Sequence, residues 1–183
     1  MPFSFEKTHI ESVLLVKPKL FSDSRGYFFE TFKDSDFVKN GIETIFNQDN
    51  QSFSKKGVIR GIHFQKNPKP QGKLVRCLRG KIFDVAVDLR KDSPTFKKWV
   101  GFELSQENKH MLWIPEGFGH GFSVLSDEAE IAYKCTNEYD PSLDSGIRYD
   151  DPELGIDWHV KEPLISDKDK VLPFLKDTLS NIS

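Results

Sequence analysis

GVIRGIHFQKNPKPQGKLVRCLRGKIFDVAVDL, at residues 57–89, is the stretch that decides the fold. Its glycines separate three β-like runs. In the third run, FDVAVDL at 83–89, apolar side chains alternate with polar or small ones. A period of two is typical of strands with one apolar face, so this stretch predicts a β-rich protein.

The first run carries a histidine and an arginine whose spacing is unusual for a strand. Arg60 and His63 lie three residues apart, so a regular strand would send them to opposite faces. They can share a pocket only if the backbone between them is irregular, and Gly61 is the residue that most easily permits a bulge or bend. We interpret this segment as part of a site. The alternative is an interior, hydrogen-bonded His63 and a surface Arg60.

Composition limits the classes of function. The 183 residues suffice for one domain with a full core, and we expect a single domain over 1–183. Lys+Arg 26 against Asp+Glu 28 gives a net charge of −2, which disfavours nucleic acid as a partner. The N-terminus lacks the features of a signal peptide, and no stretch has membrane-spanning length, so we expect a cytoplasmic protein without a membrane partner. Cys77 and Cys135 then favour buried free thiols, with a disulfide as the alternative.

The rest of the chain also indicates short strands. We expect an edge strand at 12–19, a turn at 23–26 with an aromatic strand after it at 27–32, helical turns at 34–40, a strand at 42–46, further strands at 96–104, 110–114, 122–125 and 129–136, and a helical tail at 171–179. Many short strands in one domain favour a sandwich or barrel.

Two polar features allow a structural or a functional interpretation. The run Asn47–Ser52 is typical of a solvated loop, although amides can also read the edge of a heterocyclic base. Glu30 lies within the aromatic run at 27–32, where it fits either the polar face of an edge strand or a ligand contact.

PEGFGH, at Pro115–His120, resembles the second motif of the cupin jelly roll. In metal-binding cupins the first motif supplies H-x-H. This chain has His63-Phe64-Gln65 there, so the second histidine is missing. A His-rich or 2-His-1-carboxylate metal site therefore lacks its ligands, and we expect no catalytic metal.

Seven blocks extend the comparison along nearly the whole chain: DSRGYFFETF, QDNQSFS, GVIRGIHFQ, QGKLVRCLRGKIFDVAVDLRK, SPTF, LWIPEGFGHGF and ISDKDK. In this order they resemble the dTDP-4-dehydrorhamnose 3,5-epimerase family of deoxysugar biosynthesis. The resemblance implies an all-β, cupin-type jelly roll, or double-stranded β-helix, with a short helical C-terminal segment. It also implies a dTDP-sugar substrate, no cofactor and a homodimer.

The implied reaction removes a proton beside the C4 ketone and returns it to the opposite face, which needs a base, an oxyanion stabiliser and an acid. By resemblance, His63 is the base, Lys73 stabilises the enolate and Tyr133 is the acid. Asp169 would orient the histidine. From sequence alone Asp84 is an equal candidate for that role.

The resemblance also assigns the binding residues. Arg25, Arg60 and Lys168 match charged positions suited to a diphosphate. Further contacts fall on Glu30, Gln48, Asn50, Lys73, His120 and Asp144, the last at a position where the family often has glutamate. Because N-terminal strands of the relatives contribute to the partner's site, Arg25 and Glu30 are expected to serve the other subunit.

Each assignment has a competing interpretation. Lys73 would otherwise be a surface lysine, Tyr133 a barrel-lining aromatic and Asp169 an exposed charge. For the whole chain, the alternatives are a 3-only or 5-only epimerase or a ketoisomerase on a related sugar, a non-catalytic cupin that binds nucleotide sugars, and a metal-dependent cupin oxygenase, which the missing H-x-H disfavours.

Overall fold

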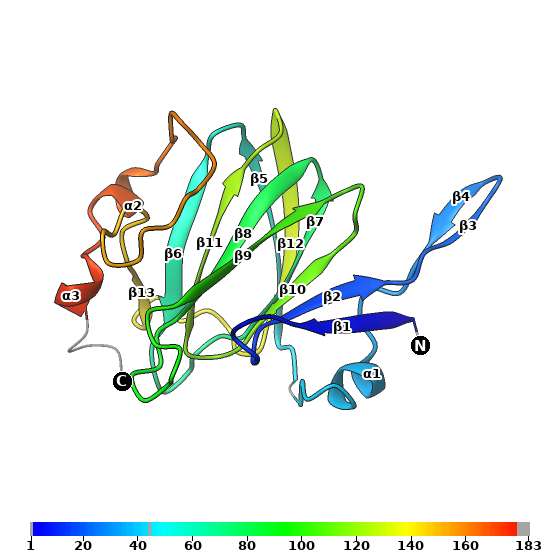
Figure 1. The fold of residues 1–183 in the computed structure, drawn as a ribbon, viewed down its shortest axis with the longest axis horizontal. Coiled ribbons are helices and arrows are strands. Elements are labelled where there is room, and N and C mark those ends of the chain that lie inside the picture. Colours follow the sequence, from blue (N-terminus) through cyan, green and yellow to red (C-terminus); the bar gives the residue numbers. More distant parts are fainter. Residues whose placement is uncertain (1, 44, 179–183) are drawn as a thin grey trace.

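The computed structural model describes residues 2–43 and 45–178 (Figure 1). The strands are β1 Phe3–Lys7, β2 Leu14–Pro18, β3 Phe21–Asp23, β4 Gly26–Phe28, β5 Gln48–Lys55, β6 Ile59–Gln65, β7 Lys73–Arg79, β8 Lys81–Asp88, β9 Trp99–Ser105, β10 Met111–Ile114, β11 Phe118–Val124, β12 Glu128–Cys135 and β13 Asp144–Gly146. The short helices are α1 Asp34–Val38, α2 Asp167–Lys170 and α3 Leu175–Thr178.

Two antiparallel sheets face each other. One has the order β1-β2-β10-β7-β12-β5, and the other has the order β13-β6-β11-β8-β9. A third, two-stranded sheet is the hairpin β3-β4, which projects away from the rest of the molecule (Figure 1). The arrangement confirms the predicted cupin-type jelly roll.

The space between the sheets holds the main core. Val75 and Ile131 of the six-stranded sheet meet Ile82, Ala86 and other apolar side chains of the five-stranded sheet. The apolar side chains that alternate along the third run have a different place: Val85 and Val87 belong to a second cluster on the outer face. The prediction of a strand there is confirmed, but its more apolar face points away from the space between the sheets.

The C-terminal segment covers that outer face. Leu154, Trp158 and Leu175 pack in the same cluster as the β8 valines, and Figure 1 shows the segment, in orange and red, beside β6. Helix in the predicted tail is confined to α3, while residue 179 lies outside the described part. Pro173 precedes this helix, where a missing backbone N–H is tolerated.

The prediction of a loop at Asn47–Ser52 was wrong, because most of this run belongs to β5. That strand pairs with β12 in continuous register from Gln48↔Cys135 to Lys55↔Glu128. A polar strand is possible here because β5 is the edge of its sheet, so ladder hydrogen bonds rather than apolar burial hold it in place. The predicted strand at 42–46 does not form in its described residues.

Near the N-terminus three expectations need correction. β2 is an interior strand between β1 and β10, with Pro18 tolerated as its last residue. β1 lacks a clear pattern and was not predicted. The aromatic strand ends at Phe28 instead of residue 32. Farther along, β11 begins at Phe118, so His120 lies inside that strand and not before a strand at 122–125.

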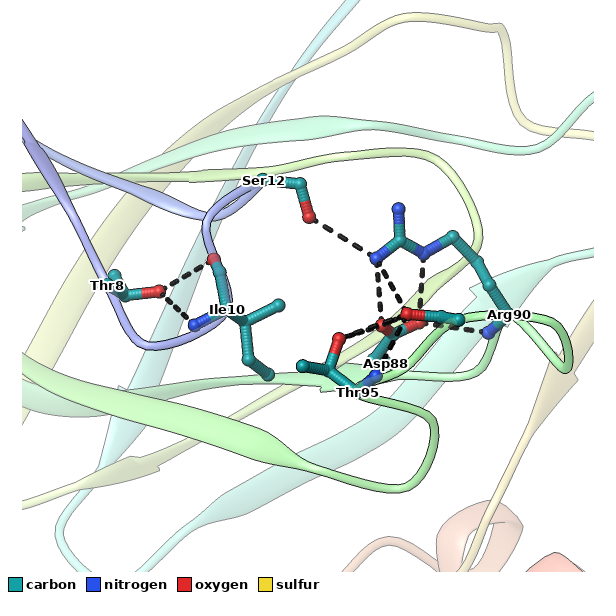
Figure 2. Close-up of polar contacts among 7 residues, drawn as sticks. Thr8, Ile10, Ser12, Asp88, Arg90 and Thr95 are labelled. Atoms are coloured by element: carbon teal, nitrogen blue, oxygen red, sulfur yellow. Dashed lines mark hydrogen bonds and ion pairs between the residues drawn. The ribbon is translucent and has the colours of Figure 1, made fainter.

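A buried carboxylate fixes the connection between β8 and β9 (Figure 2). Asp88 accepts hydrogen bonds from the Arg90 guanidinium and from the hydroxyls of Ser93 and Thr95, the last two at 2.6 Å. Arg90 also reaches Ser12 Oγ, which ties this turn to the N-terminal segment. Burial raises the pKa of Asp88, but these donors outweigh it and lower the pKa to about 2.

Cys77 and Cys135 are buried and free, as expected. Burial raises the pKa of the Cys77 thiol to about 12, so it is an inert core side chain. Among the described residues, no helix has the length and apolar character needed to cross a membrane.

Candidate active site

A pocket of about 720 Å³ opens between the two sheets, toward the edges formed by β5 and β13. Strands from both sheets and the C-terminal segment line it. Its lining includes Gln48, Asn50, Ser52, Arg60, His63, Gln65, Gln71, Lys73, His120, Phe122, Tyr133, Tyr139, Asp144, Ser166, Lys168 and Asp169.

An irregularity in β6 brings Arg60 and His63 to the same pocket. The pairing between β6 and β11 shifts register between His63↔His120 and Arg60↔Phe122. Gly61 has a φ of +123°, and a Cβ on it would lie 2.6 Å from the Cα of Gly121. Only glycine fits such a close backbone approach. The predicted bulge at Gly61 is therefore confirmed.

His63 is held by a carboxylate from the C-terminal segment. Its Nε2 lies 3.1 Å from Asp169 Oδ1, and the Asp169 side chain is 5% exposed. Burial raises the pKa of Asp169, but hydrogen bonds from His63 and from the Gly61 amide outweigh it and leave this pKa lowered. An ionised carboxylate only accepts hydrogen bonds, so the ring nitrogen that faces it, Nε2, carries a proton.

Lys73 and Tyr133 approach from the opposite sheet. The Lys73 Nζ lies 5.9 Å from the centre of the Tyr133 ring, and both residues line the pocket. Burial lowers the pKa of Lys73, with the charge of Asp84 opposing it, and burial raises the pKa of Tyr133. Lys73 is thus buried and is not a surface lysine.

Asp84 pairs with His120 and not with His63. His120 Nε2 lies 2.8 Å from Asp84 Oδ1, and both side chains are buried. The sequence-based alternative that Asp84 orients His63 is therefore wrong, because β8 places this carboxylate opposite β11. Burial lowers the pKa of His120, although the charge of Asp84 opposes this effect. The second oxygen of Asp84 has no hydrogen-bond partner.

Two cations lie at the mouth of the pocket. Arg60 donates from Nε to Ser54 Oγ at 3.0 Å and has an exposed side chain. Lys168 forms an ion pair with Asp144, which also accepts from the Tyr139 hydroxyl at 3.3 Å. The carboxylate of Asp144 thus contacts two other pocket residues.

The amides predicted to bind the ligand lie along β5. Gln48 Nε2 donates to Asn50 Oδ1 at 2.9 Å, and Gln48 Oε1 accepts from the Tyr139 amide at 2.7 Å. Asn50 Nδ2 lies 3.5 Å from the sulfur of Cys135. Both amides line the pocket, although in a strand instead of the expected loop.

Arg25 and Glu30 lie outside this pocket. Arg25 is at the turn of the projecting β3-β4 hairpin, where its guanidinium pairs with Asp23 at 2.6 Å and its side chain is 87% exposed. Glu30 follows β4 on the same arm. Of the predicted site residues, these two are the ones that the fold of one chain does not bring to the others.

The pocket residues that were not found from the sequence include Gln71, Tyr139 and Ser166. Tyr139, half exposed, lies in a turn-rich stretch whose only signal was an aromatic residue among polar ones. Ser166 caps α2 and accepts from the Asp169 amide at 3.1 Å. The S-x-x-D spacing before a short helix is a capping signal that could have identified it.

The described residues do not fit a cupin metal site. They contain no group of three or more His, Cys, Asp or Glu side chains that could hold an ion. Gln65, at the position of the second histidine of the cupin motif, binds backbone groups at both ends of its amide.

The chain is similar to known proteins over nearly its whole length. Residues 7–177 match a family model described as dTDP-4-dehydrorhamnose 3,5-epimerase. A dTDP-4-dehydrorhamnose 3,5-epimerase from Methanothermobacter thermautotrophicus is 54% identical over 171 residues, covering 92% of each chain. A dTDP-4-dehydrorhamnose 3-epimerase from Streptomyces niveus is 41% identical over 162 residues, 88% of this chain and 78% of that protein.

The chain is also similar to a solved structure. The dTDP-6-deoxy-D-glucose-3,5-epimerase from Legionella pneumophila, in complex with dTDP-4-keto-L-rhamnose, superposes with a TM-score of 0.92 at 47% identity. The match covers 95% of this chain and 93% of that one.

Proposed function

Because the chain belongs to the dTDP-4-dehydrorhamnose 3,5-epimerase family, we infer that it is an isomerase that converts dTDP-4-dehydro-6-deoxy-D-glucose to dTDP-4-dehydro-L-rhamnose. The reaction inverts C3 and C5, which both flank the C4 carbonyl. Removing either proton gives an enolate, and returning a proton to the other face inverts the carbon.

One structural observation supports this inference independently of the similarity to known epimerases. His63 belongs to the five-stranded sheet and Tyr133 to the facing six-stranded sheet, and both line the pocket between them. A sugar ring lying between the sheets has one residue on each face. Inversion at carbon needs this placement of base and acid, whereas a binding module has no use for it.

We assign the steps as follows. Nδ1 of His63 removes the proton, and Asp169 stabilises the imidazolium that results. The Lys73 ammonium stabilises the oxyanion at C4, and its buried position strengthens this interaction because the local dielectric constant is low. The Tyr133 hydroxyl then delivers a proton from the other face. Its raised pKa keeps it protonated at neutral pH.

The nucleotide half of the substrate is assigned to the mouth. The catalytic groups are the more buried ones, so the sugar lies deep and the diphosphate lies near the exposed Arg60 and Lys168. Guanidinium and ammonium groups suit a diphosphate. Gln48 and Asn50 provide donors and acceptors for the remaining polar groups, and His120 contacts the sugar through its free Nδ1.

We propose that the protein works as a homodimer in which the β3-β4 arm completes the partner's pocket. Support comes from the exposed apolar side chains on this arm, Phe21, Tyr27 and Phe28, which are 48%, 57% and 65% exposed. Such a cluster is costly in water and marks an interaction surface. Arg25 and Glu30 on the same arm would then meet a second copy's substrate.

We further propose that residues 1–183 act as one domain, that the reaction needs no metal or cofactor, and that the protein is cytoplasmic. The family match from 7 to 177 supports the first point. The amide of Gln65 at the cupin ligand position supports the second. Two buried free thiols fit a reducing compartment and support the third.

Product stereochemistry tests the proposed reaction. The protein is incubated with dTDP-4-dehydro-6-deoxy-D-glucose, and NMR coupling constants of the product are measured. Inversion at both C3 and C5 is the expected result. Inversion at C3 alone would instead indicate the activity named for the Streptomyces niveus relative, and unchanged substrate would contradict both.

A further inference from the structure

Gln65 uses both ends of its amide to hold two loops. Its Nε2 donates to the carbonyl of Lys69 at 2.5 Å and to that of Glu138 at 3.1 Å, while its Oε1 accepts from the Asp140 amide at 2.9 Å. The residue is 6% exposed. A side-chain amide offers two donors and an acceptor, and here all three hydrogen bonds are made to backbone groups.

The second of these loops carries an aromatic residue of the pocket. We call residues 136–143, between β12 and β13, the mouth loop. Three glutamines from different parts of the pocket wall bind four consecutive residues of it. Gln71 donates to Asn137 O at 2.8 Å, Gln65 binds residues 138 and 140, and Gln48 accepts from Tyr139 N at 2.7 Å.

These bonds fix the backbone on both sides of Tyr139 and leave its ring open. Tyr139 is 50% exposed and lines the pocket, and its hydroxyl reaches Asp144, which pairs with Lys168. A loop on the surface with an exposed ring would otherwise lose conformational freedom when a ligand binds. Holding the backbone in advance removes that cost.

We propose that Gln65 is a positioning residue for the nucleotide half of the substrate, acting through the mouth loop. This inference rests on the proposed function, because it takes the mouth of the pocket as the nucleotide end. Gln65 occupies the position at which metal-binding cupins have a metal ligand. In this protein the residue at that position holds the mouth loop in place. Catalysis at His63 and Tyr133 does not pass through it.

The test compares Gln65→Leu with the matched control Gln106→Leu. Gln106 also holds a turn through its amide, accepting from Gly80 N at 2.9 Å, but it lies outside the pocket. Gln65→Glu is a second variant, which keeps an acceptor for Asp140 N and loses both donors. Binding of dTDP alone is measured by calorimetry, and KM and kcat are measured with the dTDP-sugar.

We expect Gln65→Leu and Gln65→Glu to weaken dTDP binding and raise KM by about tenfold, with kcat within about threefold of wild type. Gln106→Leu should leave all three values unchanged. Tyr139→Leu should cost less affinity in the Gln65→Leu background than in wild type, because both changes remove one element. Wild-type affinity for dTDP in both Gln65 variants would overturn the proposal, as would fully additive effects.

Hydrogen exchange separates this proposal from the proposed function. In the free protein, the amides of Tyr139 and Asp140 should exchange faster in Gln65→Leu than in wild type or Gln106→Leu. Unchanged exchange would overturn the positioning role whatever the substrate is. Failure of the wild-type protein to bind dTDP, with the exchange result as expected, would instead contradict the proposed function.

Discussion

His63 Nε2 lies 3.1 Å from Asp169 Oδ1, although 106 residues separate the two in sequence. The contact joins β6 to the α2 segment, and the Gly61 amide donates to the same carboxylate at 3.3 Å. The irregular part of β6 and the orientation of the imidazole are therefore fixed by one buried group. In this arrangement Nε2 faces Asp169, and Nδ1 is the ring nitrogen that we propose acts as the base.

Asp169→Asn should lower kcat by about 10²- to 10⁴-fold with little change in KM, because an amide can donate to Nε2 and stabilise the wrong tautomer. Steady-state kinetics measures the effect. Asp167→Asn is the matched control, since Asp167 lies on the same helix with a 99% exposed side chain. Equal activity of the two variants would contradict the role given to Asp169.

Asp84→Asn should move the alkaline limb of the pH profile of kcat to lower pH. The charge of Asp84 raises the pKa of Lys73 against the lowering effect of burial, so its removal lowers the pKa of Lys73 further. Lys73 then loses its proton, and with it the stabilisation of the oxyanion, at a lower pH. An alkaline limb that stays in place would show that another group determines it.

Hybrid dimers test the proposal that the β3-β4 arm of one subunit completes the pocket of the other. Arg25→Ala alone should lower activity at least tenfold. Co-expression of Arg25→Ala with His63→Ala should restore about a quarter of wild-type activity, because half of the dimers are hybrids and each hybrid has one intact site. Co-expression of Lys73→Met with His63→Ala is the control, since both lesions lie in the same pocket. No rescue in the first mixture would contradict sharing of the arm.

Asp88→Asn should lower the free energy of unfolding at pH 7 by about 2 kcal/mol, the equivalent of a carboxyl pKa lowered from 3.8 to about 2. A lowered folded-state pKa stabilises above the unfolded value, and this stabilisation is lost as the pH falls from about 4 toward 2. Urea unfolding should therefore show the two proteins converging in that range. Asp127→Asn changes a side chain that is 93% exposed, so its free energy of unfolding should equal that of wild type both at pH 7 and near pH 2.

Much of the fold follows from local sequence. The alternation in FDVAVDL predicts β8, and the combination of Arg60, Gly61 and His63 predicts the irregularity that β6 shows. In each case a local feature, the side-chain period or the freedom of glycine, determines the outcome.

Other features depend on contacts that sequence does not reveal. Gln48–Lys55 becomes a strand because β12 offers a complete ladder, which overrides the weak strand propensity of its polar residues. Asp84 and Asp169 are both plausible partners of His63 in sequence, and only the pairing of β8 with β11 gives Asp84 to His120. Tyr139 has no local signal beyond an aromatic ring among polar residues, because its position depends on three glutamines from other segments.

Solvent deuterium exchange tests the central claim, that His63 removes both protons. The substrate dTDP-4-dehydro-6-deoxy-D-glucose is incubated in D₂O, and NMR follows the C3 and C5 positions with wild type, His63→Ala and Tyr133→Phe. His9→Ala is the control, because His9 is exposed and its ring hydrogen-bonds to the backbone carbonyl of Trp99. We expect deuterium at both carbons with wild type and His9→Ala, and none with His63→Ala. Exchange at wild-type rate in His63→Ala, or none in wild type, would contradict the account.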